Sequence, residues 1–298
     1  MSNNYNLENR TIIVTGANSG IGKAAAIQLA SMGANVVMAC RSAERGAQAR
    51  EDVCRQANSS QVELMLVDMA SHASIRRFAE EFKTKHPRLD VLIHNAANFD
   101  HRLKKPEITE DGIETIFATN HVGIFLMTHL LLDTLKASAP SRIITVASKG
   151  LITYPFLNIE FDNLNGERKF STQHAYYHAK LAQVIYTYEL TERLKGSGVT
   201  VNCVRVTNVA IPDDRITHLP NWVQKIYKIK RSMAITPERQ AETYVYLAAD
   251  PAVANISGGY WDENNCQVRS NSNSYNRETW KRLWEVTARL ARVETTRG

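Results

Sequence analysis

Short apolar runs alternate with longer amphipathic stretches along most of the chain. The apolar runs are six to nine residues long and rich in β-branched side chains, as is typical of buried parallel strands. They cover residues 11–16, 35–40, 62–69, 89–97, 141–148 and 199–206. The stretches between them favour helices. This order predicts an α/β fold, a doubly wound parallel sheet of the Rossmann type with helices on both faces.

The longest helical stretch, residues 112–138, separates the fourth predicted strand from the fifth. Its apolar part is interrupted by His129 and Asp133, and no unbroken apolar run reaches the roughly 18 residues that a membrane helix needs. The first ten residues are polar and unlike a signal peptide. Because we find neither a linker nor an internal repeat, we expect residues 1–298 to form one soluble, cytoplasmic domain.

Composition narrows the classes of protein to consider. Hydrophobic residues make up 44% of the chain, which is enough to build a large core. The net charge is +6, but the basic residues are scattered among acidic ones, so we expect no nucleic-acid partner. The four cysteines lie far apart without a C-x-x-C pair, which argues against a metal site or a disulfide framework.

The first predicted strand runs into the glycine-rich turn "TGANSGIG", residues 15–22. Gly16, Gly20 and Gly22 permit close approach of the backbone to a pyrophosphate, and the following helix offers free N–H groups at its start. A glycine turn alone also suits any tight connection. Its place in the first strand–helix unit of a parallel sheet favours a nucleotide site.

The end of the second predicted strand indicates which dinucleotide binds. An acidic residue there would accept hydrogen bonds from the adenosine ribose, but the sequence has Cys40 and Arg41. Arg41 can instead pair with a 2′-phosphate, which favours NADP(H), although a solvated surface arginine is the alternative. Lys23 at the start of the first helix is a second candidate cation.

The stretch "HAYYHAKLA", residues 174–182, places two adjacent tyrosines near Lys180. Tyr176 lies four residues before the lysine and Tyr177 three, so either pair can share a helix face. A charged lysine would favour the tyrosinate and lower the pKa of a neighbouring tyrosine, as acid–base catalysis requires. The spacing alone leaves both tyrosines as candidates.

These features together resemble the short-chain dehydrogenase/reductase family. The matching motifs appear in the family's order, namely "TGANSGIG" (15–22), "VDM" (67–69), "HNAA" (94–97), "TNHVG" (119–123), "VAS" (146–148) and "YYHAK" (176–180). "ACRSAERG" and the C-terminal "SGGYW…WKRLWEVTARL" look closest to the branch of retinol dehydrogenases, the WW-domain oxidoreductase and protochlorophyllide reductases. A photoenzyme is not expected, because Asn208 stands where the protochlorophyllide reductases have a cysteine.

The resemblance implies the roles of individual residues. It selects Tyr176 over Tyr177, since the family's lysine follows the catalytic tyrosine by four, and it assigns Tyr177 to packing. The implied catalytic residues are Asn120, Ser148, Tyr176 and Lys180. The implied cofactor-binding residues are Gly16, Asn18, Ser19, Gly20, Ile21, Gly22, Arg41, Asp68, Met69, Asn95, Ala96, Tyr176, Lys180 and Val209.

The sequence departs from the family after the sixth predicted strand. The family's Pro-Gly is replaced by Val206 and Thr207, and Ile211 stands where a threonine often contacts the cofactor. Since threonine tolerates positive φ poorly, the loop's path is expected to change. The following segment, residues 208–236, is expected to fold over the ligand, and its apolar positions suit an apolar substrate. An ordinary amphipathic helix packed on its own domain is the alternative, and contact with a membrane surface is another that we do not favour.

The leading hypothesis from the sequence is an NADP(H)-dependent carbonyl reductase or alcohol dehydrogenase that acts on a small molecule. The alternative is a nucleotide-binding interaction protein with little turnover, because of the altered loop at Val206 and Thr207. A methyltransferase on a similar sheet would need no Y-x-x-x-K motif. The sequence is compatible with a homo-oligomer, and it identifies neither the substrate nor the direction of the reaction.

Overall fold

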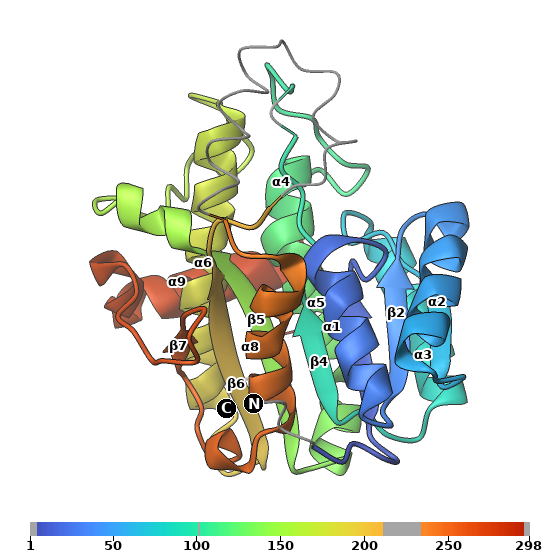
Figure 1. The fold of residues 1–298 in the computed structure, drawn as a ribbon. Helices are drawn as coiled ribbons and strands as arrows, with labels where there is room; N and C mark the ends of the chain where they lie inside the picture. Colours follow the sequence, from blue (N-terminus) through green and yellow to red (C-terminus); the bar gives the residue numbers. More distant parts are fainter. Residues whose placement is uncertain (1–4, 101, 211–233, 295–298) are drawn as a thin grey trace.

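The chain folds around one seven-stranded parallel sheet with the order β3-β2-β1-β4-β5-β6-β7 (Figure 1). The structure is a computed structural model that describes residues 5–100, 102–210 and 234–294. The strands are β1 Thr11–Thr15, β2 Asn35–Cys40, β3 Val62–Leu66, β4 Val91–His94, β5 Ser141–Ser148, β6 Val199–Val206 and β7 Tyr260–Trp261. The order turns back at β1 and β4, as in a doubly wound sheet, so the predicted fold class is confirmed.

Three predicted strands have the same bounds in the structure, namely those at 35–40, 141–148 and 199–206. The runs at 62–69 and 89–97 are longer than their strands, because the chain leaves the sheet after Leu66 and after His94. The residues beyond those points lie in the turns at the carboxyl edge, where some of them, such as Val67 and Met69, are buried although they lie outside the strands. The two-residue strand β7 was not predicted.

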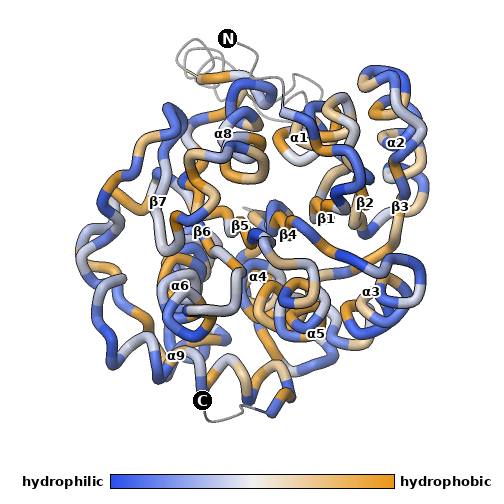
Figure 2. Tube along the Cα trace, turned by 90° about the horizontal axis from the view of Figure 1, so that it is seen from below, coloured by the Kyte–Doolittle hydropathy of each residue, from blue (hydrophilic) through white to orange (hydrophobic). Residues whose placement is uncertain are grey.

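Helices cover both faces of the sheet, as Figure 2 shows. One face carries α1 (Gly20–Ser31), α2 (Ala43–Ala57) and α8 (Pro237–Ala249). The other carries α3 (His72–Lys85), α4 (Thr115–Phe117), α5 (Gly123–Ala137) and α6 (Thr172–Arg193), with α9 (Arg277–Leu290) packed outside α6. Each face has its own core of fully buried aliphatic and aromatic side chains.

The predicted helix at 112–138 is not a uniform α-helix. A π-helical turn, Ala118–Val122, separates α4 from α5. A sequence pattern cannot reveal this turn, because the side chains on both sides of it remain apolar. The 23-residue stretch Thr115–Ala137 is long and apolar enough to cross a membrane, but 72% of its most apolar window is buried within the described residues, as expected of a core helix.

Candidate functional site

The predicted site residues come together at the carboxyl edge of the sheet. Gly16 follows β1, Asn95 follows β4, Ser148 ends β5 and Val206 ends β6. Parallel strands end at the same edge, and crevices at the point where the strand order reverses are the usual ligand sites of such sheets. Four segments that are distant in the sequence therefore converge on one edge of the sheet.

The glycine turn between β1 and α1 leaves no room for side chains at two positions. Gly16 has φ +67°, and a Cβ atom there would lie 2.9 Å from the Ala96 Cα atom. A Cβ atom at Gly22 would lie 2.4 Å from the Asn95 Nδ2 atom and 2.6 Å from the Gly16 carbonyl oxygen. Both glycines are thus required by close packing against the end of β4.

Gly20 differs from these two glycines because a Cβ atom there would meet nothing within 4 Å. It begins α1, and the preceding Ser19 makes no capping hydrogen bond through its side chain. The first N–H groups of α1 are therefore not satisfied by a cap, and open space lies beside them. This arrangement fits the pyrophosphate of a dinucleotide, which the N-terminus of a helix attracts through its N–H groups and dipole.

Asn95, which the family resemblance assigned to the cofactor, holds the glycine turn in place. Its Nδ2 atom donates to the carbonyl oxygens of Thr15 at 3.0 Å and of Gly16 at 3.3 Å. Its Oδ1 atom accepts from the hydroxyl of Tyr244, which is buried in α8, at 3.2 Å. The backbone N–H of Ala96 donates to Thr15 Oγ1 at 2.9 Å. These long-range contacts were not evident from the sequence.

The two candidate cations near the second strand differ in their surroundings. Arg41 is exposed and, among the described residues, forms no ion pair, so its guanidinium is available to a ligand. Lys23 is paired with Asp52 at 2.6 Å, which compensates its charge. Cys40 is buried, and burial raises the pKa of its thiol to about 11, although the backbone of Ala17 and Asn18 acts in the opposite direction and lowers that pKa. Arg41 is therefore the stronger candidate.

Asp68 and Met69 lie in the turn between β3 and α3, at the same edge of the sheet. The Asp68 carboxylate accepts from the N–H of Ala70 at 2.9 Å, and the Asp68 N–H donates to Ser74 Oγ at 2.9 Å. A Cβ atom at Gly123 would lie 2.1 Å from the Met69 carbonyl oxygen. The turn is thus fixed by its own hydrogen bonds and by the start of α5.

Tyr176 and Lys180 lie one turn apart on α6, and the Lys180 Nζ atom is 5.7 Å from the centroid of the Tyr176 ring. The Ser148 side chain lies close enough to the Tyr176 hydroxyl to lower the pKa of that hydroxyl against the effect of burial. The structure therefore brings together three of the four predicted catalytic side chains. Tyr177 instead packs on Tyr154, with ring centroids 4.6 Å apart, and covers Gly150, as its assignment to packing predicted.

The pKa of Tyr176 differs from the expectation drawn from the sequence. Burial raises it to about 12, Tyr177 adds to the rise, and the nearby Ser148 side chain opposes it. A lowered pKa was expected from the positive charge of Lys180, but burial of the Tyr176 hydroxyl is the largest effect. Burial also lowers the pKa of Lys180 to about 8, with a small opposing effect from Cys203.

Asn120 lies in the π-helical turn and is fully buried. Its Oδ1 atom accepts from the Asn98 N–H at 2.7 Å, and its Nδ2 atom donates to the Asn98 carbonyl oxygen at 2.8 Å. The asparagine side chain therefore clamps the loop that follows β4. Helical π-turns often occur at functional sites. The partner Asn98 was missed in the sequence, where it follows the "HNAA" motif directly.

The loop after β6 follows a path that needs no glycine. Thr207 does not adopt a positive φ, and its N–H donates to Gln240 Oε1 of α8 at 3.1 Å. The predicted difficulty at Thr207 is therefore not observed. The Ile235 N–H donates to the Asn208 carbonyl oxygen at 3.0 Å, and the Ala210 N–H donates to the Ile235 carbonyl oxygen at 2.9 Å. No described residue forms a hydrogen bond with the N–H or C=O of Val209, which lies between them.

The expectations for Ile211 and for most of the segment 208–236 fall on residues outside the described part of the chain. Beside the site, the ring centroids of Phe99 and Tyr176 lie 4.6 Å apart, and Phe99 is 48% exposed. Ile152 and Phe156, in and after the short helix η2 (Lys149–Thr153), are also exposed. No local pattern singles out Phe99, because its contact with Tyr176 is long-range.

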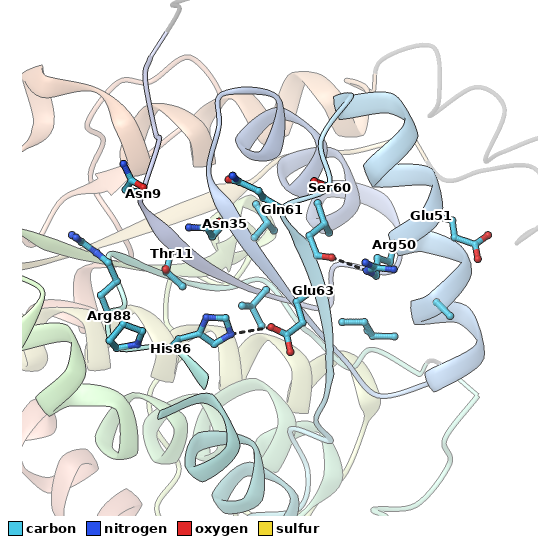
Figure 3. Close-up of a pocket in the computed structure, with 16 residues that line it drawn as sticks. Asn9, Thr11, Asn35, Arg50, Glu51, Ser60, Gln61, Glu63, His86 and Arg88 are labelled. Atoms are coloured by element: carbon cyan, nitrogen blue, oxygen red, sulfur yellow. Dashed lines mark hydrogen bonds and ion pairs between the residues drawn. The ribbon is translucent and has the colours of Figure 1, made fainter. Parts of the chain in front are cut away.

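A separate hollow of about 890 Å³ lies at the opposite edge of the sheet (Figure 3). Its lining includes Asn35 and Val62 at the starts of β2 and β3, together with Arg50 of α2. Arg50 Nε donates to the Val62 carbonyl oxygen at 2.6 Å, and Glu63 is paired with Lys85 and His86. None of the predicted site residues lines this hollow, so its size does not mark the candidate site.

Comparisons with known proteins show which sequences this chain resembles. The sequence model described as short chain dehydrogenase matches residues 10–213. Human retinol dehydrogenase 13 is 39% identical over 290 residues, which cover 96% of this chain and 85% of that protein. Human retinol dehydrogenase 14 is 39% identical over 271 residues, with coverage of 86% and 79%. Human dehydrogenase/reductase SDR family member 13 is 37% identical, with coverage of 96% and 74%.

Solved structures share the fold. A crystal structure of an uncharacterized protein from Mycobacterium paratuberculosis superimposes with a TM-score of 0.73 at 25% identity, covering 98% of this chain and 97% of that one. A short chain dehydrogenase from Salmonella enterica serovar Typhi gives a TM-score of 0.66 at 21% identity, with coverage of 86% and 96%. At this identity the second likeness concerns the fold alone.

Proposed function

Because the chain belongs to the short-chain dehydrogenase family, whose members use a nicotinamide cofactor, we propose that it is an NADP(H)-dependent oxidoreductase acting on a carbonyl or alcohol group. The observation that carries the proposal is the grouping of Ser148, Tyr176 and Lys180 beside the glycine turn. These residue types, so arranged, can hold a substrate oxygen and move a proton at it.

In the proposed reaction, the protein's residues handle the oxygen of the substrate. Ser148 orients it, and the Tyr176 hydroxyl donates the proton in reduction or accepts it in oxidation. Lys180 stabilises the ionised form of Tyr176 through its positive charge. The cofactor, when bound, supplies or accepts the hydride. Both ends of the Asn120 side-chain amide form hydrogen bonds with the main chain of Asn98, so any contribution of Asn120 to a proton path would come from its main chain.

A preference for NADP(H) over NAD(H) rests on Arg41. Its guanidinium is exposed and unpaired among the described residues, and no acidic side chain stands at Cys40 to compete for it. One charge-assisted pair with the 2′-phosphate is worth roughly 1.5–3 kcal/mol, or about ten- to a hundredfold in affinity. The same feature favours reduction as the working direction, because cells keep this cofactor largely reduced.

We expect Arg41→Ala to weaken NADPH binding by about ten- to a hundredfold while leaving NADH binding almost unchanged. Titrations of both cofactors measure the ratio directly. Arg77→Ala, which removes an exposed cation of α3 on the other face of the sheet, is the matched control. Equal affinities for the two cofactors in the unmodified protein would refute the preference.

Exposed apolar side chains support an apolar substrate. The ring of Phe99 lies against that of Tyr176, with the centroids 4.6 Å apart and the planes tilted by 43°, and Ile152 and Phe156 are exposed on the segment that follows Ser148. Exposed large apolar side chains near a polar reaction centre are typical of a site for an apolar ligand. The decisive screen uses long-chain and aromatic aldehydes, ketones and alcohols, with consumption of NADPH or formation from NADP as the readout.

The loop at Val206 and Thr207 provides the test against a binding protein with little turnover. Since Thr207 keeps an ordinary φ and Val209 leaves its backbone groups unpaired among the described residues, we expect the native loop to support turnover. Val206→Pro together with Thr207→Gly should then change the rate less than about fivefold, well below the roughly hundredfold cost of a 1 Å misplacement. Tight NADPH binding without turnover in the unmodified protein, rescued by this double change, would favour the binding protein.

A further inference from the structure

Gln183 is a fully buried polar side chain one helical turn after Lys180 on α6. Its Oε1 atom accepts a hydrogen bond from Lys180 Nζ at 2.9 Å. The orientation of the amide is fixed by chemistry, because a lysine ammonium offers only donors and must face the oxygen. The other end of the amide, Nε2, is buried and has no hydrogen-bond partner among the described residues.

A buried amide with an unused donor is an unfavourable choice for simple packing. Leaving such a donor unpaired costs stability, and an apolar side chain of the same shape would avoid the cost. Only the Oε1 end of Gln183 has a partner, and that partner is the lysine of the proposed catalytic group. The contact therefore indicates a role directed at Lys180.

The ammonium of Lys180 has three N–H donors, and two of them are already engaged. One donates to the Val146 carbonyl oxygen of β5 at 2.6 Å, and another donates to Gln183. The Val146 contact anchors the lysine to the strand that ends in Ser148. Gln183 supplies the second point that defines the direction of the remaining donor, since one contact alone leaves the ammonium free to turn.

We propose that Gln183 is a positioning residue whose amide oxygen holds the Lys180 ammonium at the end of β5 and thereby controls how Lys180 acts on Tyr176. This inference rests on the proposed function for its catalytic meaning, but the contact itself does not. Among the described residues, the Gln183 side chain forms a hydrogen bond with Lys180 and none with Tyr176 or Ser148. Gln183 therefore acts through the lysine.

Removing the amide oxygen should change the ionisation of Lys180 in a defined direction. The titratable groups around Lys180 are Tyr176 on its own helix and Cys203 on β6, while β5 contributes the Val146 carbonyl. Tyr244 of α8 stands near both Tyr176 and Cys203. An acceptor favours the charged lysine, so its loss lowers the pKa of Lys180 further, and a carboxylate in its place raises it.

Two variants of similar length separate positioning from packing. Gln183→Met keeps the unbranched shape and removes the acceptor, whereas Gln183→Glu keeps the acceptor and adds a charge. A packing role predicts that methionine is tolerated and that a buried glutamate is harmful. A positioning role predicts the reverse order. Gln173→Met and Gln173→Glu, at an exposed position near the start of the same helix, are the controls.

The first measurement follows the Lys180 side chain by NMR in the full-length protein with labelled lysine, over a range of pH. We expect the midpoint of its titration to fall in Gln183→Met, to rise in Gln183→Glu, and to stay unchanged in both Gln173 variants. An unchanged midpoint in Gln183→Met would overturn the proposal, whatever the protein's activity. Circular dichroism confirms that each variant is folded.

The second measurement is NADPH-dependent turnover against pH. We expect Gln183→Met to lose about ten- to a hundredfold in kcat with little change in KM for NADPH, and its alkaline limit to move to lower pH. Gln183→Glu should keep more activity than Gln183→Met and move that limit to higher pH. If the unmodified protein shows no turnover while the lysine midpoints shift as expected, the proposed function fails and the role of Gln183 stands.

Discussion

Replacing Tyr176 by phenylalanine is expected to lower kcat by about 10²–10⁴-fold while changing NADPH affinity less than about threefold. The reason is that only the hydroxyl is lost, and with it the proton that the substrate oxygen must gain or give up. The ring stays in place, so its contacts with Phe99 and Tyr177 are kept. Steady-state turnover and a separate NADPH titration measure the two effects.

The neighbouring Tyr177 is the matched control for this prediction. Tyr177→Phe removes the same atom one residue away, from a ring that packs on Tyr154 and over Gly150. We expect it to keep most of the activity. If Tyr177→Phe were inactive and Tyr176→Phe active, the proposed assignment of the catalytic tyrosine would be wrong.

The second large effect is expected from a single methyl group in the glycine turn. Gly22→Ala places a Cβ atom 2.4 Å from Asn95 Nδ2 and 2.6 Å from the Gly16 carbonyl oxygen. Neither neighbour can move easily. The Asn95 side chain is held by hydrogen bonds to Thr15 and Tyr244, and the Gly16 oxygen belongs to the main chain. Overpacking of this kind costs about 1–3 kcal/mol. The shifted turn should also weaken NADPH binding by about a hundredfold, the loss that about 2.7 kcal/mol produces.

Gly46→Ala provides the comparison within another helix of the same face. A Cβ atom at Gly46 would lie 2.7 Å from the end of the Leu64 side chain, which can rotate away. Alanine also gains about 1 kcal/mol over glycine inside a helix. We therefore expect near-normal stability and NADPH affinity for Gly46→Ala. If Gly22→Ala bound NADPH as tightly as Gly46→Ala, the tight packing at Gly22 would not be needed for NADPH binding, and the prediction would be wrong.

Patterns that are local in the sequence predicted most of the sheet. The strands at 35–40 and 141–148 have sharp ends because a polar or glycine-containing turn follows directly. The run at 62–69 overran its strand, since Val67 and Met69 are buried in the turn beyond β3 and look like strand residues. Hydrophobicity reports burial, and burial continues past the last paired residue.

The site was predicted as a set of residues, but several of their contacts were not. Asn95 was expected beside the cofactor, and its amide proves to hold the glycine turn. Lys23 was a candidate cation, and Asp52 compensates it. Gln183 drew no attention, because a glutamine within a helix has no local signature. Each of these contacts depends on which side chains meet across the fold, and spacing along the chain does not encode that.

The π-helical turn at residues 118–122 has a consequence for how this chain can vary in length. A π-helical turn takes up one residue more than an α-helical turn, so regular α winding through these five residues, with none removed, would turn all of α5 by about 100°. Buried side chains such as Phe125 and Leu131 would then leave the core. The π-helical turn therefore accommodates Asn120, with its hydrogen bonds to Asn98, without changing the phase of α5. Removing one residue from this turn leaves the phase of α5 intact when the turn becomes α-helical, whereas inserting one more residue would turn the whole helix.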